Sequence, residues 1–230
     1  MYYITGDKHG NLEDLVYFTF EHMTNIDDVM IILGDSGINY YQDERSYMIK
    51  NMLLQANITF FCIHGNHEER ASNINSYKEK IWKNGIVYYE EDYPNLLFAK
   101  DGEIYNFDGK KVIVIGGAYS VDKDYRLKNG LNWFESEQPS ERIKEHVENN
   151  LNKANWEVDY VLSHTSPLKY EPVEYFLPFI NQKSVDKSTE KWLNEIENKL
   201  KYKRWYLGHY HCEKIVDKIK IMYKSIDEFK

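Results

Sequence analysis

The sequence of 230 residues predicts an α/β fold, in which parallel strands alternate with helices. Short apolar runs rich in β-branched and aromatic residues predict three strands in its first third, over residues 2–5, 28–33 and 58–63. Helical patterns over residues 12–24 and 43–56 separate these runs. The strands therefore recur at intervals of about 30 residues, which is roughly the length of a β-α-β unit.

The middle of the chain predicts a change from this alternation to consecutive strands. Four short runs have strand character, at residues 86–90, 96–100, 103–107 and 111–115. Asp108-Gly109 between the last two is a strong signal for a tight hairpin turn. The run from Val112 to Ile115 is apolar throughout, which indicates a strand buried on both faces. We expect a second sheet to begin here.

The last third of the chain predicts a return to alternation. Its expected elements are, in order, a helix over 140–153, a strand over 160–162, a helix over 186–200, a strand over 204–207 and a hairpin over 214–223. The proline-rich stretch from Pro167 to Pro178 cannot form a regular helix. Because it is aromatic and lies just after His164, we expect it to form a loop over the functional site.

Composition indicates one globular domain over residues 1–230. Hydrophobic residues are 42% and charged residues 29%, ordinary globular values that speak against disordered and fibrous classes. A chain of this length buries about 70% of its unfolded surface, which is enough for a sizeable core. The two cysteines, Cys62 and Cys212, form no paired metal-binding or disulfide pattern, and Cys62 lies inside an apolar run as a core thiol would.

We expect a cytoplasmic protein with no membrane or obligate nucleic-acid partner. The first residues leave no room for the charged and apolar regions of a signal peptide, and no apolar run reaches the roughly 18 residues that span a bilayer. A net charge of −8 opposes nonspecific binding to a phosphate backbone. The 20 tyrosines and five tryptophans lack interleaved basic residues, so we interpret them as core and half-buried strand residues.

Five short segments carry metal-binding residue types where strands are expected to end. They are Asp7-Lys8-His9, Gly34-Asp35, Gly65-Asn66-His67-Glu68, Ser163-His164 and Gly208-His209-Tyr210-His211. Each alone is weak, because a Gly-Asp pair is usually only a turn. In an α/β sheet, however, side chains that follow the strands gather outside their carboxyl ends. We therefore expect these segments to converge on one site.

The donor types in these segments favour a two-metal hydrolytic site. Aspartate, histidine and asparagine together suit manganese, iron or zinc better than calcium, which prefers oxygen alone. A pair of such ions can activate water and hold both the attacking and the leaving oxygen of a phosphoryl group. His67 is left over beside Asn66, and an imidazole with a pKa near 6.5 can protonate a leaving oxygen at neutral pH.

The five segments resemble the calcineurin-like metallophosphoesterase superfamily, whose pattern is Asp-x-His, Gly-Asp, Gly-Asn-His-Asp/Glu, His and Gly-His-x-His. The resemblance extends from residue 7 to residue 211. It implies a four-layer α/β/β/α sandwich of two mixed sheets flanked by helices. It also implies hydrolysis of a phosphate ester by a bridging water or hydroxide between two divalent ions, of which manganese is favoured over iron and zinc.

The same resemblance implies a role for each position of the pattern. The implied ligands of the first metal are Asp7, His9 and His211. The implied ligands of the second metal are Asn66, His164 and His209. Asp35 is implied as the carboxylate shared by both metals, and His67 as the general acid.

Two departures from the pattern of the protein Ser/Thr phosphatases bear on the substrate. Ile38 stands where those enzymes have the acidic residue that supports the general acid, and His64 stands where they have a phosphate-binding arginine. The Gly-His-Tyr-His segment resembles instead the phosphodiesterases and small-molecule phosphatases. We therefore expect a small phosphomonoester or phosphodiester substrate, with Arg126 as the candidate that replaces the missing arginine.

Other functions compete with this hypothesis. One alternative is a phosphoprotein phosphatase, and another is a non-catalytic scaffold of the same fold that binds partners. The full ligand set and the retained His67 favour an enzyme over the scaffold. A serine hydrolase using Ser163 and His164 is disfavoured, because adjacent residues at a strand end point to opposite sides.

Overall fold

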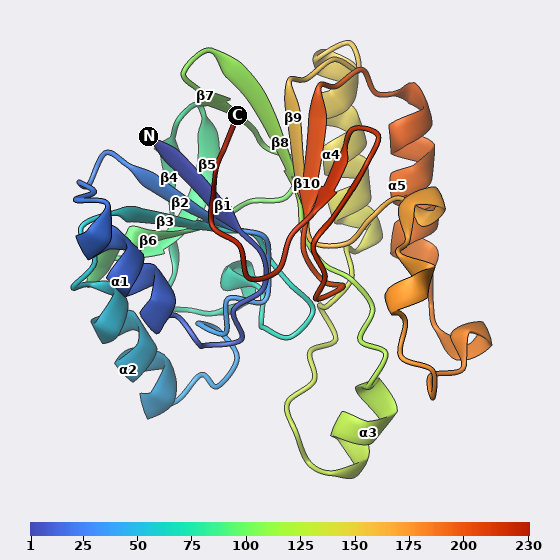
Figure 1. The fold of residues 1–230 in the computed structure, drawn as a ribbon, viewed down its shortest axis with the longest axis horizontal. Helices are drawn as coiled ribbons and strands as arrows, with labels where there is room; N and C mark the ends of the chain where they lie inside the picture. Colours follow the sequence, from blue (N-terminus) through green and yellow to red (C-terminus); the bar gives the residue numbers. More distant parts are fainter.

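The computed structural model describes residues 1–230 and contains two β-sheets packed face to face (Figure 1). The strands of the first sheet are, in spatial order, β13 (Asp227–Glu228), β1 (Tyr2–Thr5), β2 (Val29–Ile32), β3 (Thr59–Cys62), β6 (Tyr93–Ala99), β5 (Gly85–Glu90) and β4 (Lys78–Trp82). Those of the second are β11 (Lys214–Val216), β12 (Ile219–Ile221), β10 (Arg204–Leu207), β9 (Tyr160–Ser163), β8 (Lys110–Ile115) and β7 (Ile104–Phe107). Both sheets are mixed, with parallel strands at the centre and antiparallel strands at the edges.

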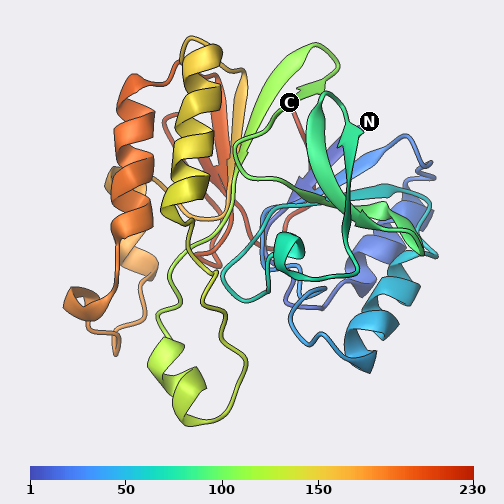
Figure 2. The ribbon, with the colours of Figure 1, turned by 180° about the vertical axis from the view of Figure 1, so that it is seen from behind.

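Helices cover the outer face of each sheet (Figures 1 and 2). Helices α1 (Glu13–Glu21) and α2 (Glu44–Leu53) lie against the first sheet, and α4 (Glu141–Lys153) and α5 (Ser188–Lys199) against the second. The short α3 (Lys123–Lys128) lies on a segment that projects from one end of the molecule (Figure 1). No helix is both long and apolar enough to cross a membrane.

Three apolar layers fill the spaces between these elements, as the alternation of side chains along a strand requires. In β2, for example, Val29 and Ile31 belong to the core between the two sheets, whereas Met30 and Ile32 belong to the core under α1 and α2. A third core lies between the second sheet and helices α4 and α5. The order helix, sheet, sheet, helix confirms the predicted four-layer α/β/β/α fold.

The expected strands and helices are present, with two differences. The second sheet begins one strand earlier than expected, with β7, because β7 forms the hairpin with β8 and pairs with it through Tyr105 and Val112. The sequence also did not reveal β4, α3 and β13. Strand β4 has a charged, largely exposed sequence at a sheet edge, α3 buries no residue, and β13 has two residues, so none carries a hydrophobic pattern.

The parallel strands bring their carboxyl ends to one end of the molecule. Thr5, Ile32 and Cys62 are aligned across β1, β2 and β3 of the first sheet. Ile115 and Leu207 are aligned with Ser163 across β8, β9 and β10 of the second. The loops that follow these strands therefore leave both sheets side by side.

The core between the sheets offers a test of the fold. Phe61 is fully buried there and packs against the rings of Trp82, Tyr105 and Phe107, with ring centroids 4.9 to 5.7 Å away. Phe61→Ala is expected to lower the free energy of unfolding by about 3–5 kcal/mol, since it leaves a cavity in the core. Urea unfolding of the metal-free protein measures this loss. Tyr17→Ala, at a 69% exposed position on α1, is the control and is expected to change stability by less than about 0.5 kcal/mol. Equal effects of the two substitutions would contradict the assigned packing.

Candidate metal centre

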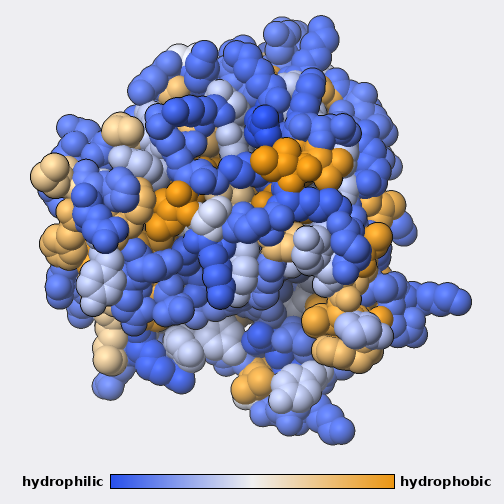
Figure 3. All heavy atoms as spheres, viewed as in Figure 1, coloured by the Kyte–Doolittle hydropathy of each residue, from blue (hydrophilic) through white to orange (hydrophobic).

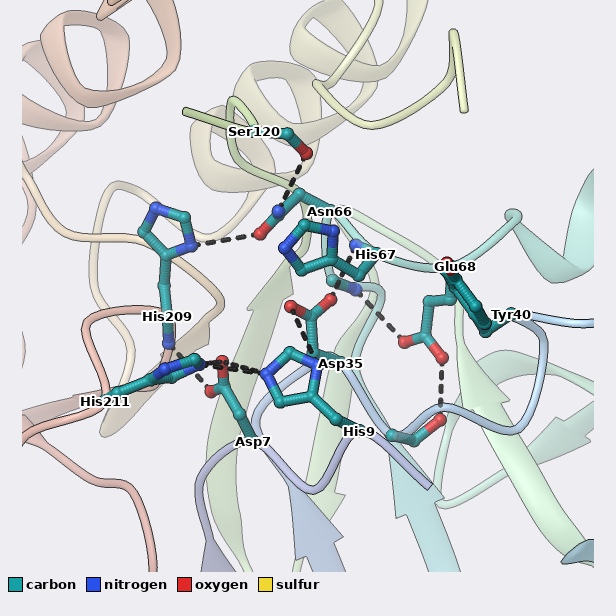
Figure 4. Close-up of polar contacts among 12 residues, drawn as sticks. Asp7, His9, Asp35, Tyr40, Asn66, His67, Glu68, Ser120, His209 and His211 are labelled. Atoms are coloured by element: carbon teal, nitrogen blue, oxygen red, sulfur yellow. Dashed lines mark hydrogen bonds and ion pairs between the residues drawn. The ribbon is translucent and has the colours of Figure 1, made fainter. Parts of the chain in front are cut away.

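The loops after β1, β2, β3, β9 and β10 bring the seven predicted ligand side chains together. Figure 4 shows six of them, all except His164. One group contains Asp7, His9 and His211. The Nε2 atoms of His9 and His211 lie 2.9 Å apart, and Asp7 Oδ2 lies 3.8 and 3.3 Å from them, respectively. These three donors come from opposite ends of the chain and meet because β1 and β10, in different sheets, end at the same end of the molecule.

A second group forms around the amide of Asn66. Its Oδ1 lies 2.8 Å from Nε2 of His164 and 3.0 Å from Nδ1 of His209. Its Nδ2 donates a hydrogen bond of 2.9 Å to Ser120 Oγ, so the amide oxygen faces the two imidazoles. Figure 4 shows the contacts of Asn66 with Ser120 and His209. His164 in turn has its Nδ1 2.8 Å from the carbonyl oxygen of Leu33, which orients its Nε2 toward the group.

Asp35 lies between the two groups. Its Oδ2 is 3.9 Å from His9 Nδ1 and 3.6 Å from His164 Nε2, and its Oδ1 accepts a 2.8 Å hydrogen bond from the His67 amide. Burial alone would raise the pKa of this carboxyl, but the His164 imidazole, followed by His67 and His9, outweighs burial and holds the pKa well below its ordinary value. Asp35 is therefore a carboxylate anion that lies close to one histidine of each group, His9 and His164.

The donors fit divalent cations. Asp7 Oδ2 is buried without a hydrogen-bond partner, which is costly for a carboxylate oxygen unless a cation or donor approaches it. Burial opposes protonation of His164, yet Asp35 and Asp7 outweigh it and raise the pKa of this imidazole to about 9, so the pocket favours positive charge. Burial lowers the pKa of His209 to about 3, which leaves its ring neutral, as a ligand must be.

The backbone of the ligand loops adopts uncommon conformations. His9, Asp35, His209 and His211 all have φ between 46° and 67°, in the left-handed region that non-glycine residues rarely adopt. Such residues persist only where the surroundings hold them in place, and they gather at functional sites. Here the surroundings include the carbonyl of Asp35, which accepts hydrogen bonds from the amides of Lys8 and His9 at 3.1 and 2.7 Å.

Two glycines of the motifs are required by close approach. A Cβ atom at Gly65 would overlap Asp35 Oδ1, and a Cβ atom at Gly208 would overlap Asp7 Oδ1. The carboxylate from one loop thus occupies the space beside the glycine of another. The Gly-Asn and Gly-His pairs of the sequence are explained by this packing.

His67 lies beside the two donor groups but belongs to neither of them. It lines a cavity of about 440 Å³ beside the two groups, and its ring centroid is 5.6 Å from that of His9. Burial lowers the pKa of His67, with the positive charge of Arg126 acting in the same direction and Asp35 opposing both. The His67 side chain is therefore part of the cavity wall next to His9.

Arg126 is not at the metal ligands. Its guanidinium donates hydrogen bonds to Asp122 Oδ2 (2.8 Å), the Tyr40 hydroxyl (3.1 Å) and the Asn132 carbonyl (3.2 Å). Asp122 and His67 line the cavity, and Arg126 lies behind Asp122. Its role as a substrate contact stays a prediction.

Other polar residues of the loops have structural partners. Ser163 Oγ accepts a hydrogen bond from the Trp205 indole at 2.7 Å and donates to the Thr165 carbonyl at 2.6 Å, so it faces away from the imidazole of His164. His64 is buried, its Nε2 lies 3.3 Å from the Ser136 carbonyl, and burial lowers its pKa. Neither residue is a cavity-lining neighbour of the two donor groups.

Two supporting residues were missed by sequence reasoning. Glu68 is completely buried, and it accepts hydrogen bonds from Ser36 Oγ (2.7 Å) and the Gly65 amide (3.2 Å), which fixes the turn that carries Asn66. Its position within the Gly-Asn-His-Glu segment was a usable signal. Ser120, which orients Asn66, lies in a loop without any motif and could be found only from the structure.

Comparisons with known proteins agree with this geometry. The family model described as calcineurin-like phosphoesterase matches residues 2–213. The structure is similar to TT1561 of Thermus thermophilus (TM-score 0.51, 12% identity, covering 96% of this chain and 87% of that one). It is also similar to the phosphopantetheinyl hydrolase PptH from Mycobacterium tuberculosis (TM-score 0.50, 14% identity, covering 96% and 87%). No curated protein sequence gives a significant match. Since the family match spans every segment that carries a donor, the chain belongs to the calcineurin-like phosphoesterase family.

Proposed function

We propose that this protein hydrolyses a small phosphate ester with a dinuclear metal centre. The observation that carries the proposal is the position of Asp35, whose carboxylate faces His9 of one donor group and His164 of the other. We assign one ion to the group of Asp7, His9 and His211, and the other to the group of Asn66, His164 and His209. Two divalent ions held there would supply an activated water and positive charge against the phosphoryl oxygens.

The protein itself would position the ester and move the proton. We assign His67 as the general acid that protonates the leaving oxygen, because its ring lines the cavity beside the donor groups without belonging to either. Its lowered pKa makes the protonated ring a stronger acid but reduces the protonated fraction as the pH rises. Leaving-group protonation is therefore most effective on the acidic side of neutrality.

The size of the cavity supports a small substrate. A volume of about 440 Å³ is in the ordinary range for sites that bind small molecules, roughly 300–1,000 Å³. At the position of Ile38, where the protein phosphatases have an acidic residue, the side chain is fully buried and apolar. This favours a small phosphomonoester or phosphodiester over a phosphoprotein.

The hydrolytic function is tested with two substrates and added metal. We expect the chelator-treated protein to be inactive and manganese to restore cleavage of p-nitrophenyl phosphate, bis-p-nitrophenyl phosphate or both. Asp35→Asn should reduce kcat/KM by about 100-fold or more, because the shared carboxylate is lost. Metal stoichiometry is measured in parallel. A protein that binds metal yet cleaves neither substrate with manganese, iron or zinc would instead be the non-catalytic scaffold.

The acid role of His67 is tested by leaving-group dependence. His67→Ala should keep its bound metal and lose about 10²–10⁴-fold in kcat on phenyl phosphate, whose leaving oxygen needs a proton. The loss on p-nitrophenyl phosphate should be much smaller, since p-nitrophenolate leaves without protonation. Equal losses on both substrates, or loss of metal, would rule out this role.

The contribution of Arg126 is tested by steady-state kinetics. We propose that its Nη2 contacts a substrate oxygen, because its three hydrogen bonds within the protein use only Nε and Nη1. Arg126→Ala should raise KM by about 10-fold or more, the effect of one charged hydrogen bond. Arg142→Ala, on the exposed surface of α4, is the matched control. Unchanged KM and kcat in Arg126→Ala would remove Arg126 from the site.

A further inference from the structure

One wall of the cavity is apolar. It is formed largely by the segment 171–185, which contributes Phe176, Leu177, Ile180 and Val185. The ring of Phe176 is nearly parallel to that of Tyr210, with an interplanar angle of 22° and centroids 6.2 Å apart. The face in Figure 3 is mainly hydrophilic but carries apolar patches, one of them at its lower right. The apolar cavity wall formed by the segment 171–185 suits the hydrocarbon or ring of an organic group attached to the phosphate.

One carboxylate interrupts this apolar wall. Glu190 of α5 lines the cavity and is only 4% exposed. Its Oε1 accepts a 2.8 Å hydrogen bond from Thr165 Oγ1, which also lies 3.0 Å from the Tyr210 hydroxyl. Its Oε2 is buried and has no hydrogen-bond partner within the protein. The carboxylate is thus held through Oε1, and Oε2 is left without a partner in a residue that lines the cavity.

An unpaired buried carboxylate oxygen costs free energy, and native proteins nearly always satisfy such atoms. Burial raises the pKa of Glu190 to about 7, which reflects the same unfavourable surroundings. A ligand that donates an N–H hydrogen bond to Oε2 would remove this cost. An ammonium group would do so best, because its charge also offsets that of the carboxylate.

Charges in the cavity oppose a second anionic group on the substrate. Besides Glu190, the cavity beyond the donor groups is lined by Asp122 and Glu171. Lys187, which lies close to this wall, is paired with Glu171 at 2.7 Å and is 5.0 Å from the centre of the Phe176 ring. No lysine or arginine lines the cavity, so a leaving group with further phosphates or a carboxylate would face these acids without a cation of the protein beside it.

We propose that the substrate is a phosphate ester of an apolar, ring-sized alcohol that carries an amine, and that Glu190 Oε2 accepts the hydrogen bond from this amine. Glu190 is then a specificity-determining residue, and the segment 171–185 packs on the apolar part. This inference rests on the proposed function, since it assigns the organic half of the same ester.

The test uses three aryl phosphates that differ in one substituent: 4-(aminomethyl)phenyl, 4-methylphenyl and 4-carboxyphenyl phosphate. With manganese, the wild-type protein should prefer the aminomethyl over the methyl compound by about 10-fold or more in kcat/KM, as expected for one charged hydrogen bond. The carboxyl compound should be the poorest of the three, because it places an anion against Glu190 and Glu171.

Glu190→Gln should abolish this order of preference. If Oε1 keeps its hydrogen bond from Thr165, the substitution places an amide NH₂ where Oε2 lies, so a donor replaces an acceptor. The preference for the amine should be lost, and the carboxyl compound should improve relative to the methyl compound. Glu195→Gln, on the exposed side of the same helix, is the control and should keep the wild-type order. Circular dichroism and a urea midpoint establish that both variants fold.

Calorimetric titration of the manganese-loaded protein with the same compounds reads the preference without turnover. If no compound is cleaved but the amine binds more tightly and Glu190→Gln abolishes that difference, the catalytic proposal fails and the recognition by Glu190 stands. A wild-type protein that neither cleaves nor binds the amine preferentially would overturn the inference. A folded Glu190→Gln variant that keeps the wild-type preference would overturn it as well.

Discussion

The arrangement of the candidate site depends on Asp35 more than on any other residue. Its backbone carbonyl accepts hydrogen bonds from the amides of Lys8 and His9. Its carboxylate accepts a hydrogen bond from the amide of His67 and faces the imidazoles of His9 and His164. One residue thereby joins the loops after β1, β2 and β3 to the loop after β9. Its buried charge is tolerated because imidazoles surround it, which is also the environment that two cations would occupy.

This constraint explains why the fold needs two sheets in contact. The donors of each group come from both sheets, so the groups exist only while the sheets keep their relative position. The apolar core between the sheets, with Phe61 and Tyr105 at its centre, maintains that position. At the other side of the cavity, α5 and the segment 171–185 supply a surface of different chemistry, apolar with one unpaired carboxylate at Glu190. The fold therefore separates the phosphate end of the cavity from the end that we assign to the organic group.

Elements with a strong hydrophobic pattern were predictable, and elements without one were not. Strands β1, β2, β3 and β8 are apolar runs buried on both sides, and their bounds were predicted to within two residues. Strand β4 has the sequence Lys-Glu-Lys-Ile-Trp and is stabilised by pairing with β5, a contact that the local sequence does not encode. The start of the second sheet was misplaced by one strand for a related reason. The sheet to which a strand belongs depends on the strands it pairs with and not on its own hydrophobic pattern.

By itself the sequence determined the α/β alternation, the donor set and its order along the chain, because hydrophobic period and residue chemistry are local properties. The glycines beside the donors were visible too, although their cause was not. Only the tertiary structure decided the distances between the donors, that Arg126 is held by Asp122, and that Glu190 lines the cavity with an oxygen unpaired. Those facts depend on the distances between segments far apart in the chain. Such distances are set by the packing of the two sheets, which no single segment specifies.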